Sequence, residues 1–200
     1  MTAQPAPKRS RKSAADRKAE IVRTAIRLAG ELGPDRVTTQ RIADAVGLTQ
    51  PAVFRHFPAK TDIWLAVGEW IAPADGRGEP VSKAESPAEQ LREVVAAYFE
   101  GIARNPAIPA ILFSRELHAE NDKLRKHFEL VMRRRLARFT ALVQAAQDSG
   151  ELSKSIPAPD LAALVLALVQ GLAMRWSLEN RSFDLKKEGV RLLGQLLTVA

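Results

Sequence analysis

The chain has 200 residues, of which 46% are hydrophobic and 26% are charged. These proportions are typical of a globular protein and exclude a fibrous or wholly disordered one. The absence of cysteine excludes disulfides, thiolate metal sites, iron–sulfur clusters and cysteine nucleophiles, while the formal net charge of +7 suggests a polyanionic partner.

The excess of positive charge lies entirely in the first third of the chain. Residues 1–60 contain 12 Lys and Arg against 5 Asp and Glu, whereas residues 61–200 contain 18 of each kind. Basic residues that served only solubility would not be segregated in this way. The asymmetry predicts an N-terminal module that binds a polyanion, attached to a neutral body.

The sequence predicts neither a secretory signal nor a membrane span. Residues 1–17 are rich in Pro, Ser, Lys and Arg and lack an apolar signal core. The most apolar stretch, 161–174, is interrupted by Gln170 and is shorter than the roughly 20 residues that span a bilayer. We therefore expect a soluble cytoplasmic protein that does not bind membranes.

Apolar residues recur at helical spacing along most of the chain, and no segment alternates in the manner of a strand. N-caps are predicted at Asp16, at Thr38 or Thr39, at Thr49 and at Ser86. Two short helices on either side of Gly47 have the outline of a helix-turn-helix. The predicted helices are 16–32, 38–46, 50–57, 60–71, 87–104, 109–118, 121–149, 160–180 and 184–199.

The expected fold is therefore all-α, with about nine helices. Glycines and prolines gather between residues 72 and 87 and predict a linker between two helical units. The predicted organisation is a disordered basic arm (1–15), a helix-turn-helix domain with a connecting helix (16–71), the linker (72–87), and a helical regulatory and dimerisation domain (88–200).

The stretch from Arg36 to Lys60, RVTTQRIADAVGLTQPAVFRHFPAK, resembles the DNA-binding domain of TetR-family transcriptional regulators of the TetR/AcrR type. The matching features are the paired threonines, the glycine turn, an aromatic residue at 54, and His56-Phe57. This resemblance implies a sequence-specific DNA-binding regulator, a repressor that a small-molecule effector releases from a palindromic operator. It also implies a homodimer whose last two helices form the interface.

Val53 and Phe57 are four residues apart and are expected to face the core. Gln50 could then contact an adenine edge, Arg55 a guanine edge or a phosphate, and Pro51 and Ala52 a thymine methyl group. Alternatively, the Gln50 side chain only contacts solvent, and Arg55 forms an ion pair with an acidic residue of the same chain. His56 is as well suited to packing in the protein as to contacting a phosphate. The predicted DNA-binding residues are Thr38, Thr39, Arg41, Thr49, Gln50, Pro51, Ala52, Arg55, His56 and Lys60.

Two further features concern the DNA-binding unit. Where this chain has Phe54, the TetR family usually has a tyrosine whose hydroxyl reaches a phosphate, so we expect Phe54 to lie in the core. The basic arm is expected to follow the DNA backbone or to enter the minor groove. Its basic residues are Lys8, Arg9, Arg11 and Lys12.

The body is expected to hold an effector pocket and a dimer interface. Alternatively, the pocket candidates are ordinary core, and the interface helices are buried within a monomer. The pocket candidates are Tyr98, Phe99, Phe113, His118, Phe128, Met132 and Trp176. The interface candidates are Leu161, Val165, Leu168, Leu172, Leu193, Leu196 and Leu197. The arginine run 133–135 and Arg138 are expected on a solvated helix face.

Two alternatives remain open at this stage. The proline-ended recognition helix and the Arg104-Asn105-Pro106 segment also resemble TetR-fold nucleoid occlusion factors, in which a protein partner would replace the effector. An enzyme is not expected, because the sequence lacks the common motifs of hydrolases, metalloproteases and phosphate-binding loops. No cofactor and no metal are expected.

Overall fold

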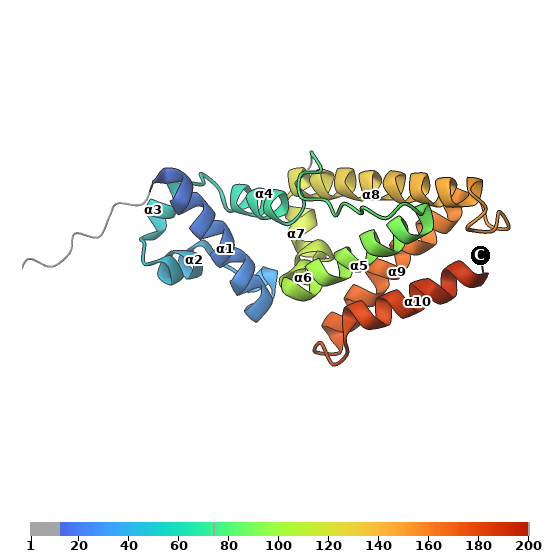
Figure 1. The fold of residues 1–200 in the computed structure, drawn as a ribbon. Coiled ribbons are helices and arrows are strands. Elements are labelled where there is room, and N and C mark those ends of the chain that lie inside the picture. The colour runs from blue at the N-terminus through green and yellow to red at the C-terminus, as the bar shows by residue number, and fades with distance from the viewer. Residues whose placement is uncertain (1–12, 74, 200) are drawn as a thin grey trace, which may run out of the picture.

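The computed structural model describes residues 13–73 and 75–199, and it confirms an all-α fold (Figure 1). These residues form ten α-helices and one 3-10 helix, and none of them is in a strand. The predicted helix 109–118 is wrong, because two helices occupy this region. Ser114 accepts a hydrogen bond from the Leu117 amide at 3.1 Å and so caps a second helix. The bounds are α6 (Ala107–Leu112) and α7 (Arg115–Glu120).

Four α-helices and a 3-10 turn make up the end of the molecule that is predicted to bind DNA, at the left of Figure 1. They are α1 (Ala14–Leu32), the 3-10 helix η1 (Pro34–Arg36), α2 (Thr39–Val46), α3 (Gln50–Phe54) and α4 (Lys60–Ile71). The predicted N-cap at Asp16 is wrong, since Ser13 caps α1 and the Asp16 carboxylate accepts a hydrogen bond from the Ser13 amide. Helix α1 therefore includes Ala14 and Ala15, which were predicted to belong to the arm. The four basic residues of the arm lie outside the described part of the chain.

The remaining long helices form the body. They are α5 (Pro87–Arg104), α8 (Asp122–Asp148), α9 (Ala158–Leu178) and α10 (Leu185–Val199). Helix α9 packs against α8, α10, α5 and α6. By length and composition alone α9 is the one helix of the described chain that could cross a membrane, with a mean hydropathy of 1.7. Its inner face is part of the core of the body.

Two hydrophobic clusters organise the structure. The first joins α5, α8, α9 and α10, and we call it the body core. The second joins α1, α2, α3 and α4 with α6, α7 and the first turns of α8, and we call it the junction core. The junction core includes Ile111, Leu124 and Phe128. The DNA-binding helices therefore share buried side chains with the near end of the body.

Candidate DNA-binding face and internal cavity

Helices α2 and α3 form a helix-turn-helix. Thr38 caps α2 by accepting a hydrogen bond from the Arg41 amide at 3.1 Å, as predicted. Gly47 ends α2 in the left-handed region with φ +67°, which glycine adopts without a Cβ penalty. Val53 and Phe57 are buried at 0% and 7% exposure, which confirms their predicted inward orientation.

Most of the predicted DNA-binding residues lie at the surface. The hydroxyl of Thr49 does not cap α3, and Arg55 forms no ion pair with any described residue. Residues at half-buried positions are Gln50, His56 and Lys60. The exposed ones are Thr38, Arg41, Thr49, Pro51 and Arg55.

Three predicted orientations at this end are wrong. Ala52 is buried at 6% exposure, so its methyl group is not offered to a thymine. Phe54, expected in the core, is 38% exposed, because each step along a helix turns the side chain by about 100° and Ala52 and Val53 occupy the inner face. Thr39 is buried at 6%, on the same side of α2 as Ile42 and Ala43.

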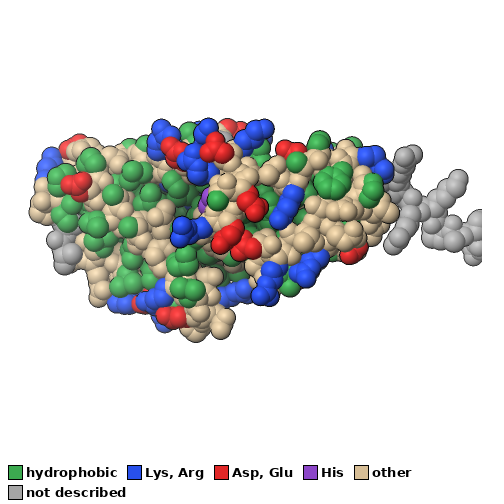
Figure 2. Space-filling view, turned by 180° about the vertical axis from the view of Figure 1, so that it is seen from behind, with side chains coloured by type: hydrophobic (Ala, Val, Ile, Leu, Met, Phe, Trp, Pro, Cys, Tyr) green, Lys and Arg blue, Asp and Glu red, His purple; other side chains and the backbone are tan. Residues whose placement is uncertain are grey.

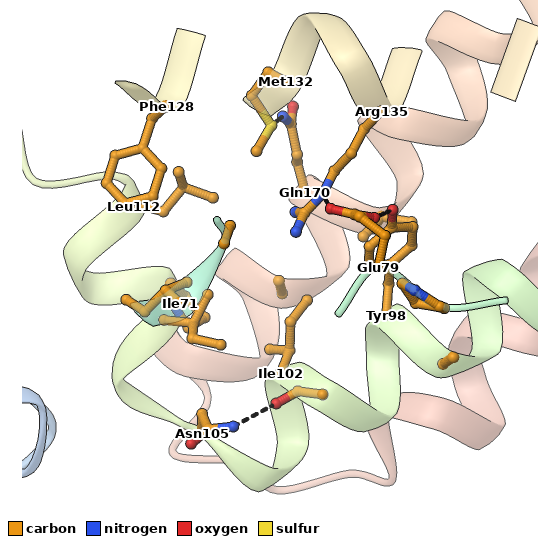
Figure 3. Close-up of a pocket in the computed structure, with 18 of the residues that line it drawn as sticks. Ile71, Glu79, Tyr98, Ile102, Asn105, Leu112, Phe128, Met132, Arg135 and Gln170 are labelled. Carbon is orange, nitrogen blue, oxygen red and sulfur yellow. Dashed lines mark hydrogen bonds and ion pairs between the residues drawn. The ribbon is translucent and has the colours of Figure 1, made fainter. Parts of the chain in front are cut away.

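A cavity of about 310 Å³ lies in the body. Its walls come from the end of α4, the segment 75–86, and helices α5, α6, α8 and α9. In the view of Figure 3, Ile71, Leu112 and Phe128 lie on one side, and Glu79, Tyr98 and Arg135 lie on the other. The cavity is thus apolar at one end and polar at the other.

The cavity includes four of the seven predicted pocket residues: Tyr98, Phe113, Phe128 and Met132. The other three do not line it. Phe99 is fully buried against Gly189 of α10. The His118 Nε2 atom lies 2.8 Å from the Leu112 carbonyl oxygen, and the Trp176 indole donates to the Phe183 carbonyl at 3.0 Å.

The polar end of the cavity centres on Glu79, which the sequence analysis did not single out. Its carboxylate accepts a hydrogen bond from the Tyr98 hydroxyl. The same carboxylate pairs with Arg135 at 3.4 Å and with Arg138 at 3.7 Å. Burial raises the pKa of Tyr98 to about 12, and the hydrogen bond to Glu79 adds to this effect. Tyr98 therefore stays a neutral donor at physiological pH.

The expected solvated face of the arginine run is wrong for Arg134, which is half-buried with a buried Nη1 atom. It is also wrong for Arg135 and Arg138, whose side chains are only 20% and 29% exposed. The Arg135 guanidinium lies 4.5 Å from the centre of the Tyr98 ring. One signal in the sequence could have placed Arg135 in the pocket. It shares a helix face with Phe128, Met132 and Phe139, at spacings of three and four residues.

Five of the seven predicted interface residues are buried within the single chain and belong to the body core: Leu161, Val165, Leu172, Leu193 and Leu197. This part of the prediction is wrong, because the inner sides of α9 and α10 carry these residues. Leu168 and Leu196 remain partly exposed and line a surface groove with Leu164 and Leu192. Figure 2 shows hydrophobic side chains gathered over the end of the molecule away from the DNA-binding helices.

No group of three or more His, Cys, Asp or Glu residues in the described chain is arranged to hold a metal ion. A surface with exposed threonines and arginines lies at one end of the molecule, and an amphipathic cavity lies in the body behind it.

Comparisons with known proteins agree with this arrangement. The nucleoid occlusion factor SlmA of Actinobacillus pleuropneumoniae serotype 5b is 32% identical over 125 residues, which are 61% of this chain and 62% of that protein. The match thus spans less than two thirds of the relative. Two solved structures share the fold, each at 19% identity. The fatty acid degradation regulator FadR of Bacillus halodurans has a TM-score of 0.75 over 94% of this chain and 96% of its own. AibR, solved with isovaleryl coenzyme A and operator DNA, has a TM-score of 0.73 over 90% and 98%.

Two family models match the sequence itself. Residues 21–67 match the model described as "Bacterial regulatory proteins, tetR family". Residues 87–197, more than half of the chain, match the model described as "BetI-type transcriptional repressor, C-terminal". The first match covers the helix-turn-helix, and the second covers the body and the part of the cavity wall that α5, α6, α8 and α9 form. The chain therefore belongs to the TetR family of transcriptional regulators.

Proposed function

We propose that the protein is a cytoplasmic, homodimeric repressor of transcription that a small molecule releases from a palindromic operator. The family and its fold are those of soluble DNA-binding regulators. The observation that carries the proposal is the position of α4. This helix begins at Lys60, next to the recognition helix α3, and its last residue Ile71 lines the cavity.

The exposed ends of α2 and α3 supply the DNA contacts. Gln50 and Arg55 reach base edges in the major groove, and Pro51 stands beside them at the start of α3. Thr38, Arg41, Thr49, His56 and Lys60 contact phosphates. In this role the Thr38 hydroxyl donates to the phosphate, since its oxygen already accepts from the backbone.

A palindromic operator requires two recognition helices about one helical turn of DNA apart, and hence two copies of the chain. The groove with Leu164, Leu168, Leu192 and Leu196 on the outer sides of α9 and α10 is the surface that we assign to this contact. Pairing α9 and α10 with the same helices of a second copy forms a four-helix interface.

An effector can release the DNA only if it binds the two states of the repressor with different affinities. The end of α4 forms part of the cavity wall, so a ligand that fills the cavity favours a different position of α4. The two recognition helices of the dimer then no longer match the spacing of the half-sites. AibR, which shares the fold, was solved with isovaleryl coenzyme A and operator DNA, so a protein of this fold can bind both a small molecule and DNA.

The test is selection of bound fragments from the source genome, followed by a titration of the best fragment at several salt concentrations. We expect a specific complex at a palindrome whose affinity falls steeply with salt, because phosphate contacts release counterions. The Arg55→Ala variant should lose specificity for the palindrome. Absence of any DNA complex, or a complex that salt does not weaken, would refute the proposal.

A second candidate function is favoured by the identity to nucleoid occlusion factors. In that case the protein acts through a DNA-dependent protein partner, and no small molecule releases it. A pull-down from a cell extract with and without the selected DNA fragment discriminates the two. Capture of one partner only in the presence of the DNA supports the second candidate.

A further inference from the structure

We propose that the effector is an organic acid, with an apolar body and one carboxylate, and that its carboxylate displaces Glu79 from the polar end of the cavity. This inference deepens the proposed function and rests on it. The residues that carry it are Glu79, Tyr98, Arg135 and Arg138. The segment 75–86 lies between α4 and α5, and we call it the strap. Displacement of Glu79 loosens its first half, while Ser82 and Ala84 stay hydrogen-bonded to α5.

Charge at the polar end favours an anion. The charged residues that line the cavity are three arginines and Glu79. Two of those arginines have partners of their own at the surface, since Arg77 pairs with Asp75 at 2.6 Å and Arg104 pairs with Glu100 at 3.4 Å. The third, Arg135, pairs only with Glu79 among the described residues.

An organic cation fits this end poorly. Its natural positions would be the Glu79 carboxylate and the face of the Tyr98 ring. The carboxylate already faces two guanidinium groups, and Arg135 already lies over the ring. A ligand cation would therefore meet two positive charges and no free acceptor of opposite charge.

A ligand carboxylate, by contrast, finds the donors that now hold Glu79. The Tyr98 hydroxyl and the Arg135 guanidinium can donate to it as they donate to Glu79. The amide of Gln170 lines the same cavity, and among the described residues it donates only to the weakly accepting sulfur of Met132, at 3.3 Å. It is therefore available as a further donor. The apolar part of the ligand then lies against Ile71, Leu112 and Phe128 (Figure 3).

Exchange of one carboxylate for another couples the ligand to the strap. A half-buried guanidinium that loses its carboxylate is strongly destabilised, so Glu79 leaves Arg135 and Arg138 only when another anion replaces it. The strap is also held by a hydrogen bond from Arg138 to the Pro80 carbonyl. Since the strap follows the end of α4 in the chain, its release removes one connection between α4 and the body, while α4 stays packed against α8.

The first experiment compares three probes of one chain length on the full chain without DNA: decanoate, 1-decanol and protonated decylamine. Isothermal titration should show decanoate binding about tenfold more tightly than 1-decanol, with the amine weakest, because charge-assisted hydrogen bonds exceed neutral ones. Hydrogen exchange of the backbone amides in residues 75–86 should become faster with decanoate only. Equal affinity for acid and alcohol would overturn the proposal, as would failure of every carboxylate from about six to twelve carbons to bind.

Two variants assign the effect to residues. Glu79→Gln removes the competing carboxylate, so decanoate should bind about tenfold more tightly while 1-decanol is unchanged. Arg135→Gln should lower decanoate affinity to that of 1-decanol. The matched control is Arg133→Gln on the same helix, whose side chain is 71% exposed and pairs with Glu129, and it should change neither affinity. A preference for decanoate that survives Arg135→Gln refutes the assignment, and if that variant does not fold, Glu79→Gln decides alone.

These measurements separate the two proposals, since none of them includes DNA. Absence of a specific operator complex refutes the repressor function whatever the probes do. Decanoate binding without preference for the carboxylate refutes only the organic-acid effector. A ligand of the proposed class should in addition lower operator affinity, and Glu79→Gln should lower the concentration of decanoate required.

Discussion

The single tyrosine of the chain allows the polar end of the cavity to be tested through pH. Burial raises the pKa of Tyr98 from 10.0 to about 12, and its hydrogen bond to the Glu79 carboxylate acts in the same direction. A difference of two pKa units corresponds to about 3 kcal/mol, at about 1.4 kcal/mol per unit. The folded state therefore prefers the neutral phenol by about that free energy.

The sign follows from proton linkage. Above pH 10 the unfolded chain loses the phenolic proton while the folded chain keeps it, so the free energy of unfolding falls as pH rises. The stabilisation is fully present below pH 10 and is lost progressively between pH 10 and about 12. Denaturant unfolding at pH 9 and above pH 11 measures this loss, and the Tyr98→Phe variant, which titrates no phenol, supplies the reference for lysine titration.

The absorbance of the tyrosinate gives the pKa directly, because no other tyrosine contributes. Glu79→Gln should lower the midpoint but leave it above the ordinary value, since burial is the larger cause. A midpoint near 10 in the wild-type chain would contradict the burial of Tyr98. So would pH profiles of unfolding that run parallel in the wild type and the Tyr98→Phe variant.

Three further predictions follow from packing and from the two interfaces. Gly189→Ala places a Cβ atom 2.2 Å from the buried ring of Phe99 and should lower the free energy of unfolding by roughly 1–3 kcal/mol. Gly101→Ala, whose new Cβ would meet no atom of the described chain within 4 Å apart from its chain neighbours and the backbone of its own helix, should raise the free energy of unfolding by up to about 1 kcal/mol. Equal thermal stability of the two variants would contradict this prediction. Leu168→Asp should convert the dimer to monomer in sedimentation velocity with little change in helix content, and an unchanged sedimentation coefficient would exclude the groove as the interface. Gln50→Ala should reduce the binding free energy for the operator by about 1–3 kcal/mol through one base position. Lys60→Ala should weaken binding to all DNA sequences alike and reduce the slope of log affinity against log salt concentration by about one. Equal losses for all sequences in both variants would refute base recognition by Gln50.

Local signals predicted the DNA-binding end well. The Thr38 cap, the Gly47 turn, and Val53 and Phe57 on one helix face are determined by neighbours within one or two helical turns. The error at Phe54 has a local cause as well. A helix of five residues has room for few inward positions, and Ala52 and Val53 already occupy them.

The polar end of the cavity could not be predicted from local pattern. Glu79 lies in a segment without regular structure, and its partners Tyr98, Arg135 and Arg138 are 19 to 59 positions away along the chain, on two different helices. Only the packing of α5 against α8 brings these partners together. A helix that is apolar on several sides raises a similar difficulty, because the sequence of α9 does not show which leucines face the body core.

The position of the cavity between the two cores indicates how ligand binding can affect DNA binding. Phe128 belongs to the junction core, and Tyr98 and Val169 belong to the body core, yet all three line the cavity. Helix α4 is fixed to the near end of α8, where the Asn121 side chain donates to the Thr61 carbonyl at 2.9 Å.

In the proposed mechanism, a ligand inserted between the cores moves the DNA-binding helices together with the near end of α8. Those helices move relative to α9 and α10, whose inner sides belong to the body core. The groove proposed for dimer contact is on α9 and α10, so the same movement changes the separation of the two recognition helices across the dimer. That separation is the quantity that operator binding requires to be fixed.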